Sequence, residues 1–403
     1  MYPKRHSIPP LLAVFPTRSA SAALLAPCLP DIAASLGTSY EGIGALVGAV
    51  CVGSGLAVLA VGLLGHRARP RSLLVGGAAL QVLAVIAFAS SRTLETSIVA
   101  ALFYGAAGVA DLAATALLAG IGGARRGRLL SLAHGLYALG AVVVPLVAGV
   151  ILGAGGTWRV LFAGAAAISV LTLAWVVLSG AGRGTPDATS APVAATGTGL
   201  WRVRAFRRGA LAMALYIGAE IGAVIWLPTW FRDRFGASVP VAAASVALFW
   251  ASMTAGRLLL AHRVDRSDAR VFVSRLGVIA ACAWVGVLLS GDLAVALVGV
   301  ALFGLVMSVC APALQGFTVR PFPGSETSVF GWLSTVSNAT GAAMSWTIGA
   351  TAQRIQGLPE GGVASGSGLT WALAGAPILL MAMAVVVRRP DPVTTPEAGR
   401  STP

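Results

Sequence analysis

Twelve apolar segments, each close to the length of a membrane-spanning helix, recur along the 403-residue chain and constrain its fold most strongly. A helix needs about 20 apolar residues to cross the ~30 Å hydrocarbon core of a bilayer, because each residue adds ~1.5 Å. Short connections that contain Gly, Pro or charged residues separate the segments. The segments cover residues 9–32, 42–64, 72–90, 97–120, 129–152, 158–179, 209–231, 240–262, 271–290, 293–316, 327–352 and 367–387. The sequence therefore predicts an all-α membrane protein with twelve transmembrane helices.

The composition supports this prediction. Hydrophobic residues make up 57% of the chain and charged residues 10%, whereas soluble domains carry about 25% charged residues. The net charge of +14 would suggest nucleic acid binding in a soluble protein. Here the basic residues fall in short loops, where they set orientation and contact anionic lipid. We therefore expect the lipid bilayer as a partner and no nucleic acid. The four cysteines are scattered singly, so we expect no disulfide, no metal site and no cofactor.

The basic residues are distributed unevenly between the two sets of loops. One side carries Lys4, Arg5, Arg67, Arg69, Arg71, Arg125, Arg126, Arg128, Arg202, Arg204, Arg207, Arg208, Arg263, Arg266, Arg270, Arg388 and Arg389, and the other Arg92, Arg159, Arg232, Arg234 and Arg354. Cytoplasmic loops are the ones enriched in Lys and Arg. The sequence therefore predicts a multi-pass protein of the inner (cytoplasmic) membrane with both termini in the cytoplasm. The N-terminus has no typical cleavage site, so the first segment should be retained.

The chain changes character between the sixth and seventh segments. Residues 180–199 are rich in Gly, Ala, Thr, Pro and Ser, which is typical of a flexible linker. Residues 201–208 alternate aromatic or apolar residues with Arg, which favours the membrane interface. We therefore expect an N-terminal six-helix bundle (1–179), a cytoplasmic linker with an interfacial segment (180–208), a pseudo-symmetric C-terminal six-helix bundle (209–388) and a disordered cytoplasmic tail (389–403).

The two halves contain similar loops. Residues 62–71 read GLLGHRARPR and residues 261–270 read AHRVDRSDAR, and both connect the second and third segments of their half. Two repeats around a central site are the architecture of a rocking secondary transporter. Arg67, Asp265 and Arg266 are therefore candidates for cytoplasmic gating loops. The glycines of the second segment, among them Gly44 and Gly53, predict close helix packing without a chemical role.

These loops resemble the G-x-x-x-D-R-x-G-R-R motif of the major facilitator superfamily. The first copy has His66 in place of the Asp, and the second keeps Asp265 and Arg266. Further stretches are similar to helices four, five, seven and eight of the fucose–proton symporter-like branch. They are 108–116 (GVADLAATA), 128–135 (RLLSLAHG), 216–220 (YIGAE) with Trp226, 248–250 (LFW) and 256–258 (GRL). The resemblance implies the major facilitator fold and proton-coupled uptake of a small polar, sugar-like solute.

One position departs from that branch. Its sugar symporters carry an acid in helix one just before a Pro, where this chain has Ala26 before Pro27. The first segment carries Arg18 instead, about 10–15 Å deep by helical rise. Arg18 is a candidate counter-ion to Asp111 or Glu220, a candidate substrate ligand, or a side chain that snorkels to the cytoplasmic face. Arg257 lies closer to its helix end, which favours snorkelling.

Two acids lie near the middle of their segments, Asp111 in the fourth and Glu220 in the seventh. A charged side chain at this depth costs on the order of 2.5–3.5 kcal/mol, so it normally lines a cavity or has a partner. An acid exposed alternately to each side can load and release a proton as its surroundings change. Asp111 and Glu220 are therefore proton-coupling candidates, and the resemblance implies this role for Asp111. The alternatives are a structural ion pair for Asp111 and a structural hydrogen bond for Glu220.

Other polar and aromatic residues within the segments could line a solute cavity. His134 could relay protons or serve as a packing residue. The polar amides could instead join helices, and the tryptophans could belong to the interfacial belt. The candidates for the substrate cavity are Arg18, Tyr216, Glu220, Trp226, Trp250, Gln315 and Asn338.

The sequence predicts a monomeric secondary active transporter that moves a small polar solute by alternating access with protons. No P-loop sequence is present, which argues against an ATP-driven pump. Antiport export of a cationic drug or metabolite remains an alternative. An integral membrane enzyme or sensor is a further one, although an enzyme would gather acids, His or metal ligands at one membrane face.

Overall fold

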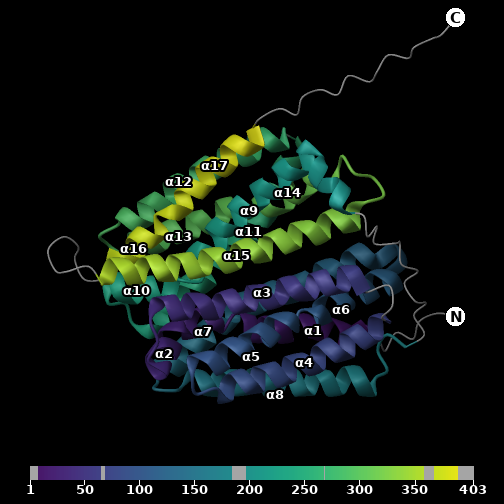
Figure 1. Ribbon diagram of the computed structural model, residues 1–403, viewed down its shortest axis with the longest axis horizontal. Helices are drawn as coiled ribbons and strands as arrows, with labels where there is room; N and C mark the ends of the chain where they lie inside the picture. The colour runs from purple at the N-terminus through teal and green to yellow at the C-terminus, as the bar shows by residue number, and fades with distance from the viewer. Residues whose placement is uncertain (1–7, 65–68, 184–196, 267, 358–366, 389–403) are drawn as a thin grey trace, which may run out of the picture.

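Helices are the only regular secondary structure in the described part of the protein. The computed structural model describes residues 8–64, 69–183, 197–266, 268–357 and 367–388 (Figure 1). The first group is α1 (Ile8–Ala22), α2 (Leu25–Leu36), α3 (Tyr40–Leu64), α4 (Pro70–Ser90), α5 (Leu94–Ala106), α6 (Val109–Gly122), α7 (Arg126–Gly153) and α8 (Trp158–Leu178). The second group is α9 (Arg204–Val224), α10 (Leu227–Phe235), α11 (Val239–Arg266), α12 (Ala269–Leu289), α13 (Leu293–Met307), α14 (Cys310–Val319), α15 (Glu326–Gln356), α16 (Ser367–Leu373) and α17 (Gly375–Arg388). Short 3-10 turns cover Gly123–Arg125 and Gly197–Arg202.

All twelve predicted segments coincide with helices or broken helices. Within the described residues, ten helices or helix pairs are long and apolar enough to span a membrane. The bent pair α9 and α10, which meet at 47°, is an eleventh candidate. The remaining segment, 327–352, corresponds to α15, which has 31 residues but carries many Ser, Thr and Gly residues. It is long enough to span, since 31 residues rise about 46 Å. The all-helical fold class is therefore confirmed.

Five of the twelve segments are broken, the last one between α16 and α17. The other four breaks lie near the middle of their segments, at equivalent places in the two halves. The first and seventh break between α1 and α2 and between α9 and α10. The fourth and tenth break between α5 and α6 and between α13 and α14. Pro27, Pro228 and Pro312 lie just after three of these breaks. Proline has no backbone N–H and so removes a helical hydrogen bond, which frees a carbonyl group for other donors.

Glycines in α3 let this helix contact two neighbours at backbone distance. A Cβ on Gly53 would lie 1.9 Å from the Leu102 carbonyl oxygen of α5. A Cβ on Gly44 would lie 2.5 Å from the Ser345 carbonyl oxygen of α15. Only glycine fits such approaches, so the packing role predicted for these glycines is confirmed.

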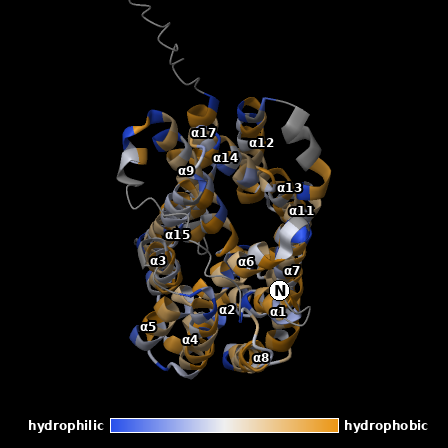
Figure 2. Cartoon of the chain, turned by 90° about the vertical axis from the view of Figure 1, so that its right-hand side faces the viewer, coloured by the Kyte–Doolittle hydropathy of each residue, from blue (hydrophilic) through white to orange (hydrophobic). Residues whose placement is uncertain are grey.

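The two groups of helices meet along two seams. α3 lies beside α15 and α7 beside α11, and Figure 2 shows these pairs on opposite sides of the molecule. In Figure 1 the first group, purple to teal, lies below the second, teal-green to yellow. Most of the candidate site lies on α1, α6, α9 and α14; α1 packs against α7 and α6, and α9 packs against α15 and α14.

Candidate functional site

Arg18 and Asp111 form a buried ion pair within the first group of helices. The Arg18 side chain on α1 is enclosed, and the residue is 7% exposed. Its Nε lies 3.6 Å from Oδ2 of Asp111 on α6. Arg18 therefore neither snorkels to a membrane face nor pairs with Glu220; among the alternatives left open by the sequence, the structure supports a counter-ion to Asp111.

The break between α5 and α6 supplies the second partner of Arg18. The amide of Gly108 would normally bond to the Tyr104 carbonyl, but it donates to the Gly105 carbonyl instead. Arg18 Nη1 donates to the Tyr104 oxygen at 2.9 Å. The guanidinium also lies over the Tyr104 ring, 4.5 Å from its centroid. The cation is thus held by a carboxylate, a freed carbonyl and an aromatic face.

Neutral polar side chains hold this arrangement in place. Tyr104 donates its hydroxyl to Ser21 Oγ at 3.2 Å, and Ser21 donates to the Arg18 carbonyl at 3.0 Å. Gln81 Nε2 donates to Ser21 Oγ at 3.2 Å and to the Thr17 carbonyl at 3.4 Å. The aromatic partner Tyr104 was missed by the sequence reasoning, because a single tyrosine within an apolar segment resembles an ordinary packing residue.

Asp111 uses only one of its carboxylate oxygens in this arrangement. Its Oδ1 is buried without a hydrogen-bond partner among the described residues, while the side chain as a whole is 27% exposed. Thr115, one turn later, donates to the Asp111 backbone carbonyl at 2.7 Å rather than to the carboxylate. A carboxylate with one unpaired oxygen can accept a proton or a solute hydrogen bond there.

The second group repeats this bonding with different side chains. Tyr216 on α9 donates its hydroxyl to the Met307 carbonyl at 3.3 Å. Arg257 Nε on α11 donates at 3.3 Å to the carbonyl of Ser308, whose helical donor would be Pro312. Since proline has no N–H, Arg257 replaces a missing bond.

The counterparts of these contacts lie in the first group. Arg18 on α1 donates to Tyr104, and Ser54 Oγ on α3 donates to the Gly105 carbonyl at 3.1 Å. In the first group, side chains of α1 and α3 therefore donate to the successive carbonyls of Tyr104 and Gly105 at the α5–α6 break. In the second group, side chains of α9 and α11 donate to those of Met307 and Ser308 at the α13–α14 break.

Glu220 lies close to this second set of contacts. It is half-buried on α9, one turn after the enclosed Tyr216, and interacts with Tyr216 and Arg257. Cys310, the first residue of α14, is a further electrostatic neighbour. Each group therefore contains one mid-segment acid beside an arginine, although the Glu220 pair has no direct ion-pair contact of the kind that joins Arg18 and Asp111.

The remaining sequence candidates are found in varied surroundings. Trp226 is fully enclosed, lies edge-on to Tyr40 at 6.0 Å, and lines no exposed surface in this conformation. Trp250 and Gln315 are half-buried. Asn338 is also half-buried and donates to the Ser334 carbonyl of its own helix at 2.9 Å.

His134 is exposed on α7 and lies edge-on to Phe15, with ring centroids 5.8 Å apart. Arg257 acts on it electrostatically across the two groups. Of the gating-loop candidates, Arg67 lies outside the described residues, as do the side chains of Asp265 and Arg266.

At the end of the molecule near α2 and α10, polar contacts join the two groups. Arg232 Nη1 lies 3.5 Å from Asp31 Oδ2. The Tyr40 hydroxyl donates to Asp233, and the Tyr40 amide donates to Gln353 Oε1 at 3.3 Å. We call these contacts the end latch. The sequence reasoning missed them, because single polar residues at helix ends resemble ordinary loop residues.

The acidic, His and Cys side chains of the described residues are not clustered. The described residues contain no group of three or more His, Cys, Asp or Glu side chains placed to hold a metal ion. The acids instead lie at separate broken helices beside arginines.

Comparison with solved structures shows shared folds at low identity. A bacterial homolog of the human lysosomal transporter Spinster, in an inward-facing and unoccupied conformation, matches with a TM-score of 0.79 and 14% identity over 96% of this chain and 97% of that one. The nucleoside transporter NupG matches with a TM-score of 0.76 and 12% identity over 96% and 100%. The human organic anion transporter MFSD10 matches with a TM-score of 0.69 and 18% identity over 96% and 100%. A comparison with curated proteins found no match.

The family model described as Major Facilitator Superfamily matches residues 12–345, most of the chain. This match and the structural neighbours support the superfamily expected from the loop motifs. They do not confirm the fucose–proton symporter-like branch. They indicate a multi-pass membrane transporter rather than an enzyme. The chain therefore belongs to the major facilitator superfamily.

Proposed function

We propose that this protein is a proton-coupled secondary transporter that moves a small polar solute by alternating access. The observation that carries the proposal is the Arg18–Asp111 pair, in which Arg18 is enclosed and one buried carboxylate oxygen of Asp111 has no partner among the described residues. A structural ion pair would be expected to use both oxygens, since an unpaired buried polar atom is costly. A carboxyl group that must gain and lose a proton needs such an unpaired position.

Protonation of Asp111 would change the balance of forces at the break between α5 and α6. A neutral Asp111 would leave the Arg18 cation with the Tyr104 carbonyl and ring as its remaining contacts. The loss of one partner from a buried charge favours rearrangement of the helices that hold it. Proton loading would thereby bias the two access states.

The contacts between the two groups of helices support the interpretation that the transporter is closed at the end near α2 and α10. The end latch joins α2 to α10 through Asp31 and Arg232, and α3 to α10 and α15 through Tyr40. We infer that this end is extracytoplasmic, because the Arg-poor loops lie there, and that both termini are cytoplasmic. The fold similarity to a transporter in an inward-facing conformation agrees with this orientation.

The repeated breaks also support two six-helix bundles at 1–179 and 209–388, joined by residues 180–208 and followed by a tail at 389–403. We propose that the solute binds between the bundles. Half-buried Glu220, Trp250, Gln315 and Asn338 would supply polar and aromatic contacts.

Uptake and export both fit this site. Uptake of a sugar-like or nucleoside-like solute would use the neutral polar groups, and one structural neighbour is a nucleoside transporter. Antiport export of a cationic solute is the second candidate, because half-buried Glu220 lacks a direct ion-pair contact. Glu220 could then accept a cation from the solute.

Counterflow in proteoliposomes tests both candidates. A panel of a monosaccharide, a nucleoside, an organic anion and a lipophilic cation would be compared with and without a pH gradient. We expect one class to exchange and its net movement to respond to the gradient. Net movement that ignores the gradient would contradict proton coupling, and no exchange of any class would contradict the proposed solute range.

A further inference from the structure

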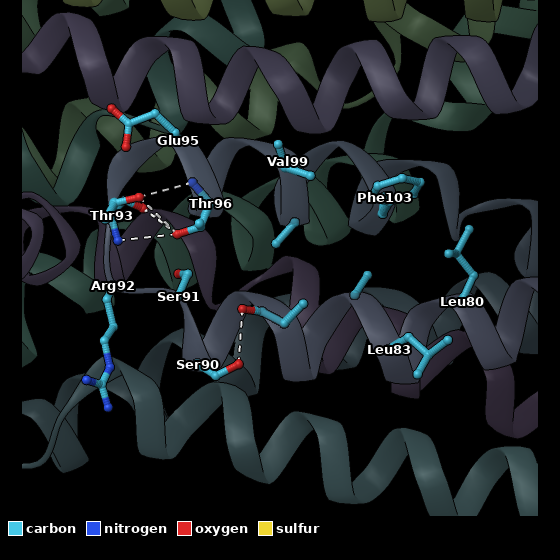
Figure 3. Close-up of a pocket in the computed structure, with 13 residues that line it drawn as sticks. Leu80, Leu83, Ser90, Ser91, Arg92, Thr93, Glu95, Thr96, Val99 and Phe103 are labelled. Atoms are coloured by element: carbon cyan, nitrogen blue, oxygen red, sulfur yellow. Dashed lines mark hydrogen bonds between the residues drawn. The ribbon is translucent and has the colours of Figure 1, made fainter.

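A groove on the outer surface of the first group of helices is unconnected with the Arg18–Asp111 site. It has a volume of about 850 Å³ and runs between α4 and α5. Leu83, Val99 and Phe103 lie along it and are 65%, 55% and 50% exposed (Figure 3). Exposed apolar side chains on a spanning helix face the hydrocarbon core of the bilayer.

The length of the groove matches one leaflet. It extends along α4 from Leu80 to Ser90, a rise of about 15 Å, which is half of the ~30 Å hydrocarbon thickness. Leu80 is therefore at about mid-depth if Ser90 is at the membrane interface. An acyl chain of a single leaflet has this reach.

A second groove follows the other side of α4. It has a volume of about 580 Å³, lies between α4 and α8, and is lined by Ile86, Val160 and Val170 among other apolar residues. Both grooves include Ser90. They therefore converge where α4 ends.

One arginine borders each groove near this point, Arg92 the first and Arg159 the second. Arg159 Nη2 donates to the Ser91 carbonyl at 2.9 Å, and its guanidinium lies over the Trp158 ring at 4.3 Å. Arg92 follows Ser91 directly and is exposed. Glu95 also borders the first groove, but it extends from the α4–α5 turn in the direction opposite to Arg92 (Figure 3). A phosphate beside the two arginines would thus avoid that carboxylate.

From these observations we propose that a phospholipid with a net negative headgroup straddles α4. Its phosphate lies between Arg92 and Arg159, and its acyl chains occupy the two grooves. Charge complementarity at the turn selects the headgroup, and the depth of the grooves fits chains of one leaflet. The site is separate from solute transport, because it faces lipid on the outer side of the bundle.

Native mass spectrometry of the purified full-length protein tests the proposal, with dioleoyl phosphatidylglycerol and dioleoyl phosphatidylcholine as probes. We expect one phosphatidylglycerol to bind the parent protein several-fold more tightly than phosphatidylcholine. The double variant Arg92→Gln, Arg159→Gln should weaken phosphatidylglycerol binding by at least about tenfold. Arg354→Gln removes another exposed arginine on the same side of the membrane and should leave the affinity unchanged.

A variant that fills the first groove tests the contribution of the acyl chains separately from that of the headgroup. Val99→Trp should weaken binding of both lipids while retaining both arginines, and melting temperatures without added lipid verify that each variant is folded. Equal phosphatidylglycerol affinity in the parent and the double variant would overturn the proposal. If Arg354→Gln lost as much phosphatidylglycerol affinity as the double variant, the proposal would also be overturned. Equal affinity of the parent for the two lipids would overturn it too, because either result would show general attraction rather than a headgroup site.

Discussion

Replacement of Asp111 by Asn tests whether the enclosed pair stabilises the fold as the geometry indicates. The change keeps the size of the side chain but removes the charge that faces Arg18 Nε at 3.6 Å. The loss of one partner from a buried ion pair typically costs about 3–5 kcal/mol. The expected cost here is smaller, because Arg18 keeps the Tyr104 carbonyl at 2.9 Å and the Tyr104 ring at 4.5 Å. Asp111 is also 27% exposed, which admits screening.

We therefore expect a loss of about 1–3 kcal/mol for Asp111→Asn, below the range typical of a fully buried pair, because Arg18 keeps two partners and Asp111 is partly exposed. Arg18→Gln should cost at least as much, because it removes all three contacts. The double variant should lose less than the sum of the two single losses, by on the order of 1–2 kcal/mol.

Unfolding of the four proteins in one detergent, followed by tryptophan fluorescence, measures this coupling. Additive losses within about 0.5 kcal/mol would refute the reasoning, because independent sites behave in that way. Arg257→Gln serves as a matched control, since Arg257 also donates to a freed carbonyl but has no direct ion pair with Asp111. Combined with Asp111→Asn, it should show additive losses.

The other contacts support four further predictions. Glu220→Gln should weaken apparent solute affinity in counterflow far more than it lowers the melting temperature; normal affinity would remove Glu220 from the solute site. Asp31→Asn should open the end latch, since it breaks the contact with Arg232, and should raise labelling of introduced cysteines on that face; unchanged labelling would contradict a latch. Gly53→Leu should prevent stable folding, because even a Cβ there would lie 1.9 Å from a carbonyl oxygen, and a normally folded variant would contradict that packing. A cysteine at Thr189, in the predicted linker outside the described residues, should react from the cytoplasmic side, and periplasmic reaction would overturn the orientation.

The sequence predicted the spanning segments well, because a bilayer demands long apolar runs and tolerates few alternatives. It did not predict that five of them are broken. Pro27, Pro228 and Pro312 lie just after three of the breaks and carried that signal. A proline within an apolar run kinks or breaks a helix only where neighbours satisfy the freed carbonyl. Those neighbours depend on packing, which a single sequence does not reveal.

The candidate site was predicted as a list of residues rather than as an arrangement. Asp111 and Arg18 were both singled out, yet their pairing depends on how α1 and α6 are rotated against each other. The apolar faces of such helices are nearly uniform, so periodicity gives little information on rotation. The Tyr104 carbonyl carries no side-chain signal at all, and the end latch depends on contacts between distant helix ends.

Proton movement coupled to solute movement is the most direct test of the role proposed for Asp111. Proteoliposomes containing the parent protein or Asp111→Asn would enclose a pH-sensitive dye, and the solute identified by counterflow would be added outside. We predict a solute-dependent pH change with the parent and none with Asp111→Asn, while Asp111→Asn still exchanges labelled solute across the membrane. The same pH change in both proteins, at equal amounts of folded transporter, would contradict the assignment of proton coupling to Asp111.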